Sequence, residues 1–177
     1  MLKKLRGLLA SRNKKDAHGY REVRIPPHRR LLLTEAAVVA IRECLAKEIA
    51  VGHEGIAYLL GQTNGETTLI VGSYRPDAET TVGSFKVSAL AMARVVRTAA
   101  DAGLQVVGQI HTHPGAAYHS EGDVEGERIA YDGYVSIVVP DYGRELPSFA
   151  RAAVYFYREG AFSRLGLKKL RVIGGRF

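Results

Sequence analysis

An apolar run that ends in two histidines constrains the fold of this chain most strongly. Residues 104–110 (LQVVGQI) are rich in β-branched side chains and have the length of a buried strand. His111 and His113 follow two residues apart, and side chains alternate across a strand, so both point to the same side at its end. Pro114 and Gly115 then turn the chain. Two imidazoles are therefore predicted to lie side by side where a buried strand ends.

A helix start follows this turn. Ser120 and Asp123 have the spacing of an N-cap and an acid three residues later, so the carboxylate is expected to face back toward the histidines. Two neutral imidazoles and one carboxylate, with a fourth position open, form the ligand set of a catalytic zinc site. A His-x-His pair alone is more often a surface or core feature, and Ser-x-x-Asp alone is usually only a cap. Their combination predicts that His111, His113 and Asp123 bind one zinc ion (Zn2+).

These residues resemble a known motif. The sequence HTHP at 111–114, followed by SEGD at 120–123, is similar to the JAMM (MPN-plus, Mov34/MPN/PAD-1) zinc metalloprotease motif of isopeptidases and bacterial JAB-type peptidases. Residues 54–61 (EGIAYLLG) resemble the upstream segment of that family, which opens with a glutamate. Six residues separate the second histidine from the serine, one fewer than in the usual pattern. The resemblance covers residues 31–162 in the order of its elements.

The resemblance implies a hydrolytic mechanism. Glu54 would take the proton of a water whose pKa is lowered by zinc, and would return that proton to the leaving amine. Ser120 would donate a hydrogen bond to the oxyanion of the tetrahedral intermediate. The implied substrate is a ubiquitin-like protein, cut after its C-terminal glycine in deconjugation or precursor processing, with E1- and E2-like proteins as further partners. Without the resemblance, the sequence would favour Glu54 no more than Glu48 or Glu66.

Three other functions stay open on the sequence alone. The chain can be an inactive binding module, although such relatives usually lose the metal ligands, which are all present here. It can be a nucleic-acid-associated JAB relative, but it lacks base-reading motifs, and basic ends alone give only non-specific, salt-sensitive binding, so we do not expect nucleic acid as its partner. A peptidase of small peptides or sulfur carriers would use the same chemistry on another tail.

His119 also lies inside the loop that carries the ligands. Three roles stay open for it: a hydrogen-bond donor near the metal, a substrate contact, or a replacement ligand in the shortened loop. We expect it to be none of the primary ligands, because a residue directly before the cap points differently from Asp123.

Composition limits the class of protein. A chain of 177 residues is expected to form one domain with a proper core. Its one cysteine, Cys44, excludes an intramolecular disulfide and is expected to pack as a small hydrophobe. No apolar run has the length of a membrane span, and the first residues lack the apolar region of a signal peptide, so we expect a cytoplasmic protein. The net charge of +7 favours acidic partners.

The elements suggest two regions. Residues 1–30 are expected to form a basic N-terminal arm, and residues 31–177 a single JAB/MPN-like domain of the α/β (α+β) class with a curved mixed sheet packed by helices. The chain ends with Gly174-Gly175 and two further residues, like a ubiquitin-type tail, although a simple terminal strand is the favoured interpretation. Apolar periodicity and turn signals predict helices at 34–50, 89–102 and 123–129, a loop at 75–84, and strands at 54–61, 67–74, 104–110, 134–139, 150–157 and 161–165.

Overall fold

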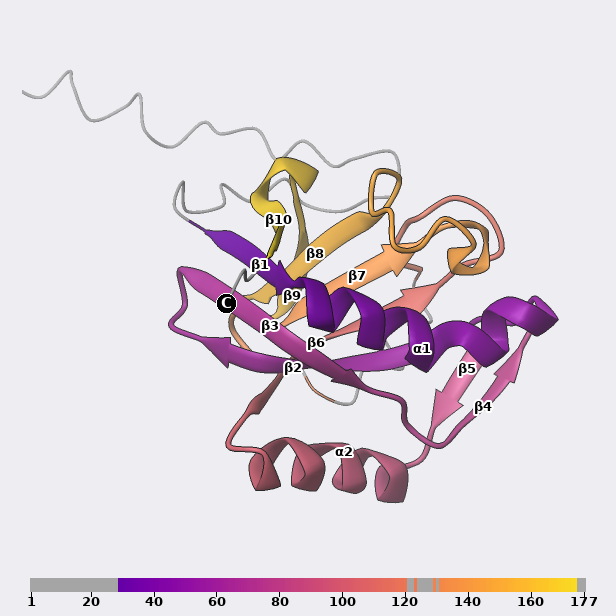
Figure 1. The fold of residues 1–177 in the computed structure, drawn as a ribbon, viewed down its shortest axis with the longest axis horizontal. Helices are drawn as coiled ribbons and strands as arrows, with labels where there is room; N and C mark the ends of the chain where they lie inside the picture. The colour runs from indigo at the N-terminus through magenta and orange to yellow at the C-terminus, as the bar shows by residue number, and fades with distance from the viewer. Residues whose placement is uncertain (1–28, 121–122, 124–128, 130, 175–177) are drawn as a thin grey trace, which may run out of the picture.

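The computed structural model describes residues 29–120, 123, 129 and 131–174. Within them, eight strands form one mixed sheet, two more form a separate ribbon, and two α-helices pack on the sheet (Figure 1). The elements are β1 (Arg30–Thr34), α1 (Glu35–Val51), β2 (Ile56–Thr63), β3 (Thr67–Tyr74), β4 (Ala78–Thr81), β5 (Ser84–Val87), α2 (Ala89–Asp101), β6 (Gln105–Thr112), β7 (Val135–Val139), η1 (Asp141–Gly143), β8 (Ala153–Arg158), β9 (Ala161–Leu165), η2 (Leu167–Lys169) and β10 (Leu170–Ile173).

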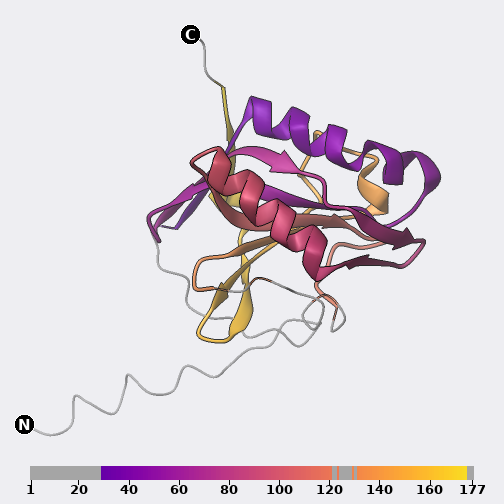
Figure 2. The same cartoon turned by 90° about the horizontal axis from the view of Figure 1, so that it is seen from below.

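The large sheet has the strand order β10-β1-β3-β2-β6-β7-β8-β9 and curls between the two helices (Figures 1 and 2). Its alternating side chains divide the core into two clusters. Along β2, Ala57 and Leu59 pack in the cluster that includes α1, whereas Ile56, Tyr58 and Leu60 pack in the cluster that includes α2. Burial on both faces explains why the central strands read as nearly continuous apolar runs. The predicted fold class, a curved mixed sheet packed with helices, is confirmed.

Both long helices begin close to the predicted residues, and each has a side-chain cap. The Thr34 hydroxyl accepts a hydrogen bond from the Ala37 N–H at 3.1 Å, and the Ser88 hydroxyl accepts one from the Ala91 N–H at 3.1 Å. Helix α1 ends at Gly52, which has a φ of 68° in the left-handed region that favours glycine.

Three features differ from the sequence predictions. The loop expected at 75–84 is wrong in part, because residues 78–87 form the β4–β5 hairpin, whose strands are short and half exposed. Strand β2 begins at Ile56, so Glu54 precedes the strand that was expected to open with it. Strand β1, which was not predicted, pairs in parallel with both β3 and β10. The helix expected at 123–129 lies mostly outside the described residues.

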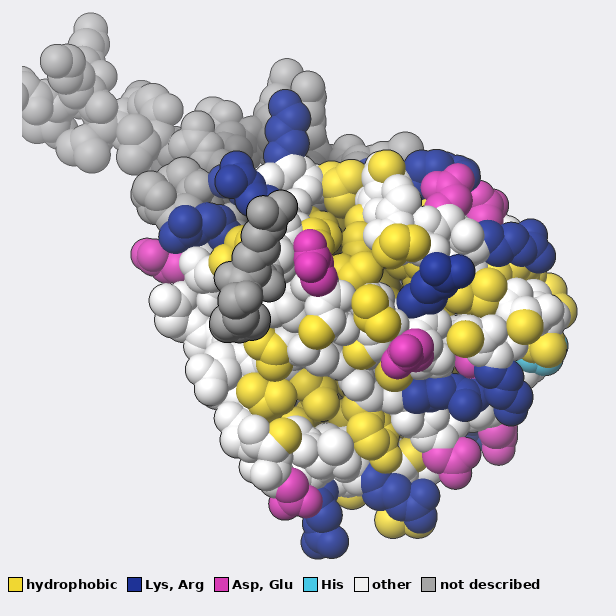
Figure 3. All heavy atoms as spheres, in the orientation of Figure 1, with side chains coloured by type: hydrophobic (Ala, Val, Ile, Leu, Met, Phe, Trp, Pro, Cys, Tyr) yellow, Lys and Arg dark blue, Asp and Glu magenta, His cyan; other side chains and the backbone are white. Residues whose placement is uncertain are grey.

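The ends of the chain bear on the arm and the tail. Residues 1–28 of the expected N-terminal arm lie outside the described residues. Arg29 is described: it is buried and donates a hydrogen bond to the Gly133 carbonyl at 2.9 Å. Residues 170–173 form the edge strand β10, and the tail after Gly174 is not described. On the face shown in Figure 3, Lys and Arg side chains stand in separate groups with Asp and Glu between them. No helix in the described part of the chain is long and apolar enough to cross a membrane.

Strand β6 carries the histidines through the middle of the sheet. It pairs antiparallel with β2, where Ile56 is the partner of His111, and parallel with β7, where Val138 is the partner of His111. The strand continues two residues further than predicted and ends at Thr112. The His113 N–H still donates to the Val139 carbonyl, at 2.9 Å, so main-chain hydrogen bonds hold both histidines at the end of this central strand.

Candidate metal centre

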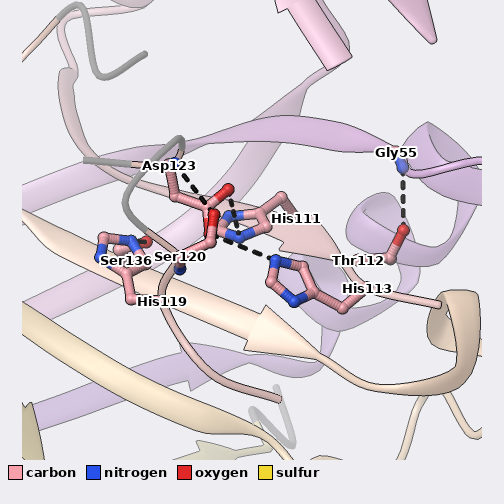
Figure 4. Close-up of polar contacts among 8 residues, drawn as sticks. All are labelled: Gly55, His111, Thr112, His113, His119, Ser120, Asp123 and Ser136. Atoms are coloured by element: carbon pink, nitrogen blue, oxygen red, sulfur yellow. Dashed lines mark hydrogen bonds and ion pairs between the residues drawn. The ribbon is translucent and has the colours of Figure 1, made fainter. Parts of the chain in front are cut away.

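His111, His113 and Asp123 converge on one point (Figure 4). Their candidate ligand atoms lie within 4.8 Å of one another. The His111 Nε2 atom lies 3.5 Å from Asp123 Oδ1, and the His113 Nε2 atom lies 3.2 Å from Asp123 Oδ2. Both imidazoles and the carboxylate are buried, with exposed fractions of 0%, 5% and 8%. The residues that the sequence assigned to the metal are therefore brought together.

The state of His111 fits a bound cation. Neither of its ring nitrogens has a hydrogen-bond partner in the described part of the chain, although the side chain is fully buried. An unpaired buried polar group is costly, and a cation bound to the imidazole would remove this cost. Two ligand atoms bound tetrahedrally at about 2.1 Å from zinc lie roughly 3.4 Å apart. The contacts of 3.5 and 3.2 Å around the Asp123 carboxylate match that spacing.

Asp123 is held ready for this role by a capping box. The Ser120 hydroxyl accepts a hydrogen bond from the Asp123 N–H at 3.1 Å, and the Ser120 N–H donates to Asp123 Oδ2 at 2.6 Å. Burial alone would raise the pKa of the Asp123 carboxyl, but the close contacts with the His111 and His113 imidazoles and the hydrogen bond from the Ser120 N–H together lower it far below its usual value. The Asp123 carboxyl group is therefore anionic at any physiological pH, as a metal ligand would have to be.

Sheet pairing brings Glu54 to the histidines. Thr112, the residue between them, accepts a hydrogen bond from the Gly55 N–H on its hydroxyl at 2.8 Å, and its own N–H donates to the Gly55 carbonyl at 3.0 Å. The Glu54 N–H donates to the Thr81 carbonyl on β4 at 2.8 Å. Glu54 is thus fixed on both sides, and it lines one cavity of about 340 Å³ together with His113, Ser120 and Asp123.

The environment of Glu54 suits a proton acceptor. Its exposed fraction is 6%, and burial, reinforced by the nearby negative charge of Asp123, raises the pKa of Glu54 to about 7. A carboxyl group with a pKa near the working pH can both take and release a proton. No other described glutamate lines this cavity.

Ser120 lines the same cavity, although its hydroxyl is directed elsewhere in this structure. It donates a hydrogen bond to Asp123 Oδ2 at 2.8 Å. A metal ion bound to the carboxylate would compete for that oxygen, which would release the hydroxyl to turn toward the cavity.

His119 lies behind the ligands rather than among them. Its Nε2 atom is 2.9 Å from the Ser136 hydroxyl, and its ring stacks on Tyr155 with ring centres 4.9 Å apart. Its ring centre is 5.8 Å from that of His111, and it is not one of the three residues of the metal group. Burial, followed by the charge of the neighbouring His111, lowers the pKa of His119 to about 3, so it is a neutral packing partner.

Two contacts that the sequence did not predict close the site. Phe85 on β5 packs over His111 with ring centres 5.4 Å apart, which helps to keep that imidazole dry. Tyr142 spans the loop and the hairpin, because its N–H donates to the His113 carbonyl at 2.8 Å and its hydroxyl donates to the Val82 carbonyl at 3.1 Å. Asp141 and Tyr142 both adopt positive φ values, of 53° and 57°, a conformation that non-glycine residues seldom adopt outside constrained sites.

The first prediction concerns Gly55. A Cβ atom there would lie 2.9 Å from Leu45 Cδ2 and 3.0 Å from Glu48 Cβ on α1, so Gly55→Ala forces the Leu45 side chain or α1 to shift. We expect a loss of about 1–3 kcal/mol in the free energy of unfolding, measured in urea. Gly115→Ala in the metal-binding loop is the matched control, because a Cβ there meets no atom within 4 Å. Equal stabilities of the two variants would contradict the close packing of α1 on this segment.

The second prediction concerns Tyr142. Tyr142→Phe removes the hydrogen bond to the β4–β5 hairpin and leaves the main-chain contact with His113 intact. We expect the apparent KM for a cleaved substrate to rise about two- to ten-fold with little change in kcat, because an exposed hydrogen bond contributes about 0.5–1.5 kcal/mol. Tyr157→Phe, on β8 beside the start of β7, is the control and should leave KM unchanged. A lower kcat with unchanged KM would show that Tyr142 acts on the ligands instead.

Comparisons with known proteins agree with this geometry. The family described as prokaryotic homologs of the JAB domain matches residues 35–151, about two thirds of the chain. A protein of Sinorhizobium fredii, named probable metalloprotease y4jG, is 34% identical over 108 residues, which cover 59% of this chain and 67% of that protein. The solution structure of protein DSY2949 from Desulfitobacterium hafniense superimposes with a TM-score of 0.61 at 15% identity, covering 82% of this chain and 94% of that one. This chain therefore belongs to the family of prokaryotic JAB-domain homologs.

Proposed function

We propose that this protein is a zinc-dependent peptidase of the JAMM type that cleaves the amide or isopeptide bond after the C-terminal glycine of a ubiquitin-like protein. The observation that carries the proposal is the convergence of His111, His113 and Asp123 beside the buried Glu54 in one cavity. A binding module would not need a buried carboxyl group with a raised pKa beside a complete ligand set.

The described side chains divide the chemistry between them. His111, His113 and Asp123 would hold zinc, which supplies an electrophile and lowers the pKa of water at its open position. Glu54 accepts a proton from the attacking water and gives it to the leaving amine as the bond breaks. The Ser120 hydroxyl turns from Asp123 to donate a hydrogen bond to the developing oxyanion. Phe85 over His111 excludes water from the ligands.

The walls of the cavity support an extended substrate. Strand β5 pairs only with β4 among the described residues, so its other edge is available for pairing beside the cavity that its residues line. An extended tail can add to such an edge as a further strand. A tail that ends in glycine would bring no side chain against the candidate ligands, and Tyr58, Phe85 and Tyr118 are among the other residues that line the cavity.

The test combines metal analysis with cleavage. Purified protein should contain about one zinc per chain and should cleave ubiquitin-like proteins encoded by neighbouring genes when they are fused through their terminal glycine to a reporter. Mass spectrometry of the products locates the bond that is cut. Zinc binding without cleavage of any fusion would leave the metal site standing and overturn this substrate class, whereas absence of bound zinc would favour the binding module.

A further inference from the structure

Gln109 is a buried polar residue for which the mechanism above has no use. It lies on β6 two residues before His111, on the same face as both histidines, and only 3% of it is exposed. It lines the same cavity as Glu54, and among the described residues no hydrogen bond to its carboxamide is found. Its polar atoms are not among the fully buried atoms that lack a partner, so they face the open space of the cavity. A carboxamide without a protein partner can bind a group that enters this space.

The neighbours of Gln109 explain why the fold itself does not satisfy it. In the sheet it is flanked by Tyr58 on β2 and Ser136 on β7. The Ser136 hydroxyl is already 2.9 Å from the His119 Nε2 atom. The carboxamide therefore remains available to the cavity, which residues of β5 also line.

We propose that the Gln109 carboxamide binds a main-chain peptide group of the substrate, and so sets which stretch of an extended chain lies against the metal centre. This inference rests on the function proposed above. A carboxamide offers one acceptor oxygen and two N–H donors, which complement the N–H and carbonyl of a peptide unit and leave no charge unmatched. The aromatic side chains along the cavity accommodate an apolar or aliphatic chain on either side of that contact.

The position of the contact follows from strand geometry. Two residues of a strand span about 6.6–6.8 Å, so Gln109 lies roughly 7 Å along β6 from His111 and roughly 13 Å from His113. An extended peptide in the cavity has nearly the same repeat. The recognised peptide group therefore lies two to four residues from the bond that is cut, where the identity of the side chain matters little and the extended backbone matters most.

The test replaces the carboxamide with an apolar group of similar shape. Gln109→Met keeps the length of the side chain and removes both donors and the acceptor. Because its carboxamide faces the cavity and has no partner among the described residues, we expect the Tm of this variant to stay close to that of the wild type. Binding is measured in the Glu54→Gln background, so that the probe is not consumed. The probe is a synthetic six-residue peptide ending in Gly-Gly, joined to the side chain of lysine.

We expect Gln109→Met to weaken binding of this isopeptide at least ten-fold while zinc content is unchanged. Gln105→Met, at the exposed start of the same strand, is the matched control and should bind normally. Probes in which single main-chain N–H groups are replaced by ester oxygens locate the contact. One ester probe, substituted two to four residues from the scissile bond, should bind the protein that keeps Gln109 more weakly than the all-amide probe does. The same substitution should change binding to the Gln109→Met variant only a little.

The outcomes separate the two proposals. If protein with Gln109 neither binds nor cleaves the isopeptide, the proposed substrate class fails and this inference fails with it. If it binds and cleaves while Gln109→Met does so equally well, the inference alone is overturned. A Tm that falls in Gln109→Met also overturns it, because the amide would then have a structural partner. If an ester substitution weakens binding to the same extent in the protein that keeps Gln109 and in Gln109→Met, another residue makes the contact and the inference is overturned.

Discussion

Hydrolysis by the Glu54→Gln variant is expected to be about 10²- to 10⁴-fold slower than that of the wild type, with unchanged zinc content, because the amide cannot accept a proton from water. Glutamine keeps the size of the side chain and the main-chain contacts of the segment, which are made by the Glu54 and Gly55 N–H groups. The effect should therefore fall on kcat, measured with a fluorogenic glycine amide or a reporter fusion.

Glu66→Gln is the matched control, since Glu66 is exposed beside the β2–β3 turn. It should leave kcat and KM as they are. If Glu54→Gln retained wild-type activity, the carboxyl group would have no part in proton transfer, and another group in the cavity would have to replace it.

The pH dependence of stability provides a second readout of Glu54. Burial, with the charge of Asp123 adding to it, raises the pKa of Glu54 from 4.5 to about 7 in the protein without metal. Between these values the folded state holds the proton more tightly than the unfolded chain. This residue therefore contributes stability at low pH that is lost as the pH rises from about 4.5 to 7.

The buried histidines change the free energy of unfolding with pH in the opposite direction to Glu54. The contribution of Glu54 therefore has to be measured as a difference between two proteins. Burial lowers the pKa of both His111 and His119, so they favour the unfolded state at low pH. The difference in free energy of unfolding between Glu54→Gln and the wild type, followed in chelator across pH 4–8, isolates Glu54 from them. We expect the variant to gain relative stability as the pH rises, and a flat difference would contradict the buried setting of this carboxyl group.

The candidate ligands could be found from the sequence because their placement depends on local rules. His111 and His113 share a face because a strand alternates, and Asp123 faces them because a cap residue and its acid are three residues apart. Glu54 needed the resemblance to a family. Its approach to the histidines depends on the pairing of β2 with β6, and apolar periodicity does not specify which strands become neighbours.

Other features could not be predicted, each for its own physical reason. The β4–β5 hairpin has strands of four residues that bury few side chains. Its sequence therefore shows too little apolar alternation to be distinguished from a loop. Tyr142 adopts a positive φ only because contacts with His113 and Val82 hold it, and residue type gives no sign of this. In the sequence, Gln109 looks like an interruption of an apolar run. Only its place in the lining of the cavity shows that it can bind a ligand there.

Loss of the metal is the expected result of Asp123→Asn. Asp123 supplies the negative charge of the ligand set and contacts both histidines, at 3.5 and 3.2 Å. Removing a group that merely orients a ligand weakens metal affinity about 10- to 100-fold, so the loss of a direct ligand should exceed that range. After dialysis against a weak chelator, elemental analysis should find about one zinc per chain in the wild type and almost none in the variant.

Thermal unfolding provides an independent check, because an ion that binds only the folded state stabilises it by about 2.7 kcal/mol at a concentration of 100 Kd. The Tm of the wild type should therefore rise with added zinc and fall with chelator, while that of Asp123→Asn should respond to neither. Asp101→Asn, at the exposed end of α2, is the control and should respond like the wild type. Should Asp123→Asn keep one zinc with an unchanged Tm response, Asp123 would not be a ligand, and the shortened loop would have to bring another oxygen to His111 and His113.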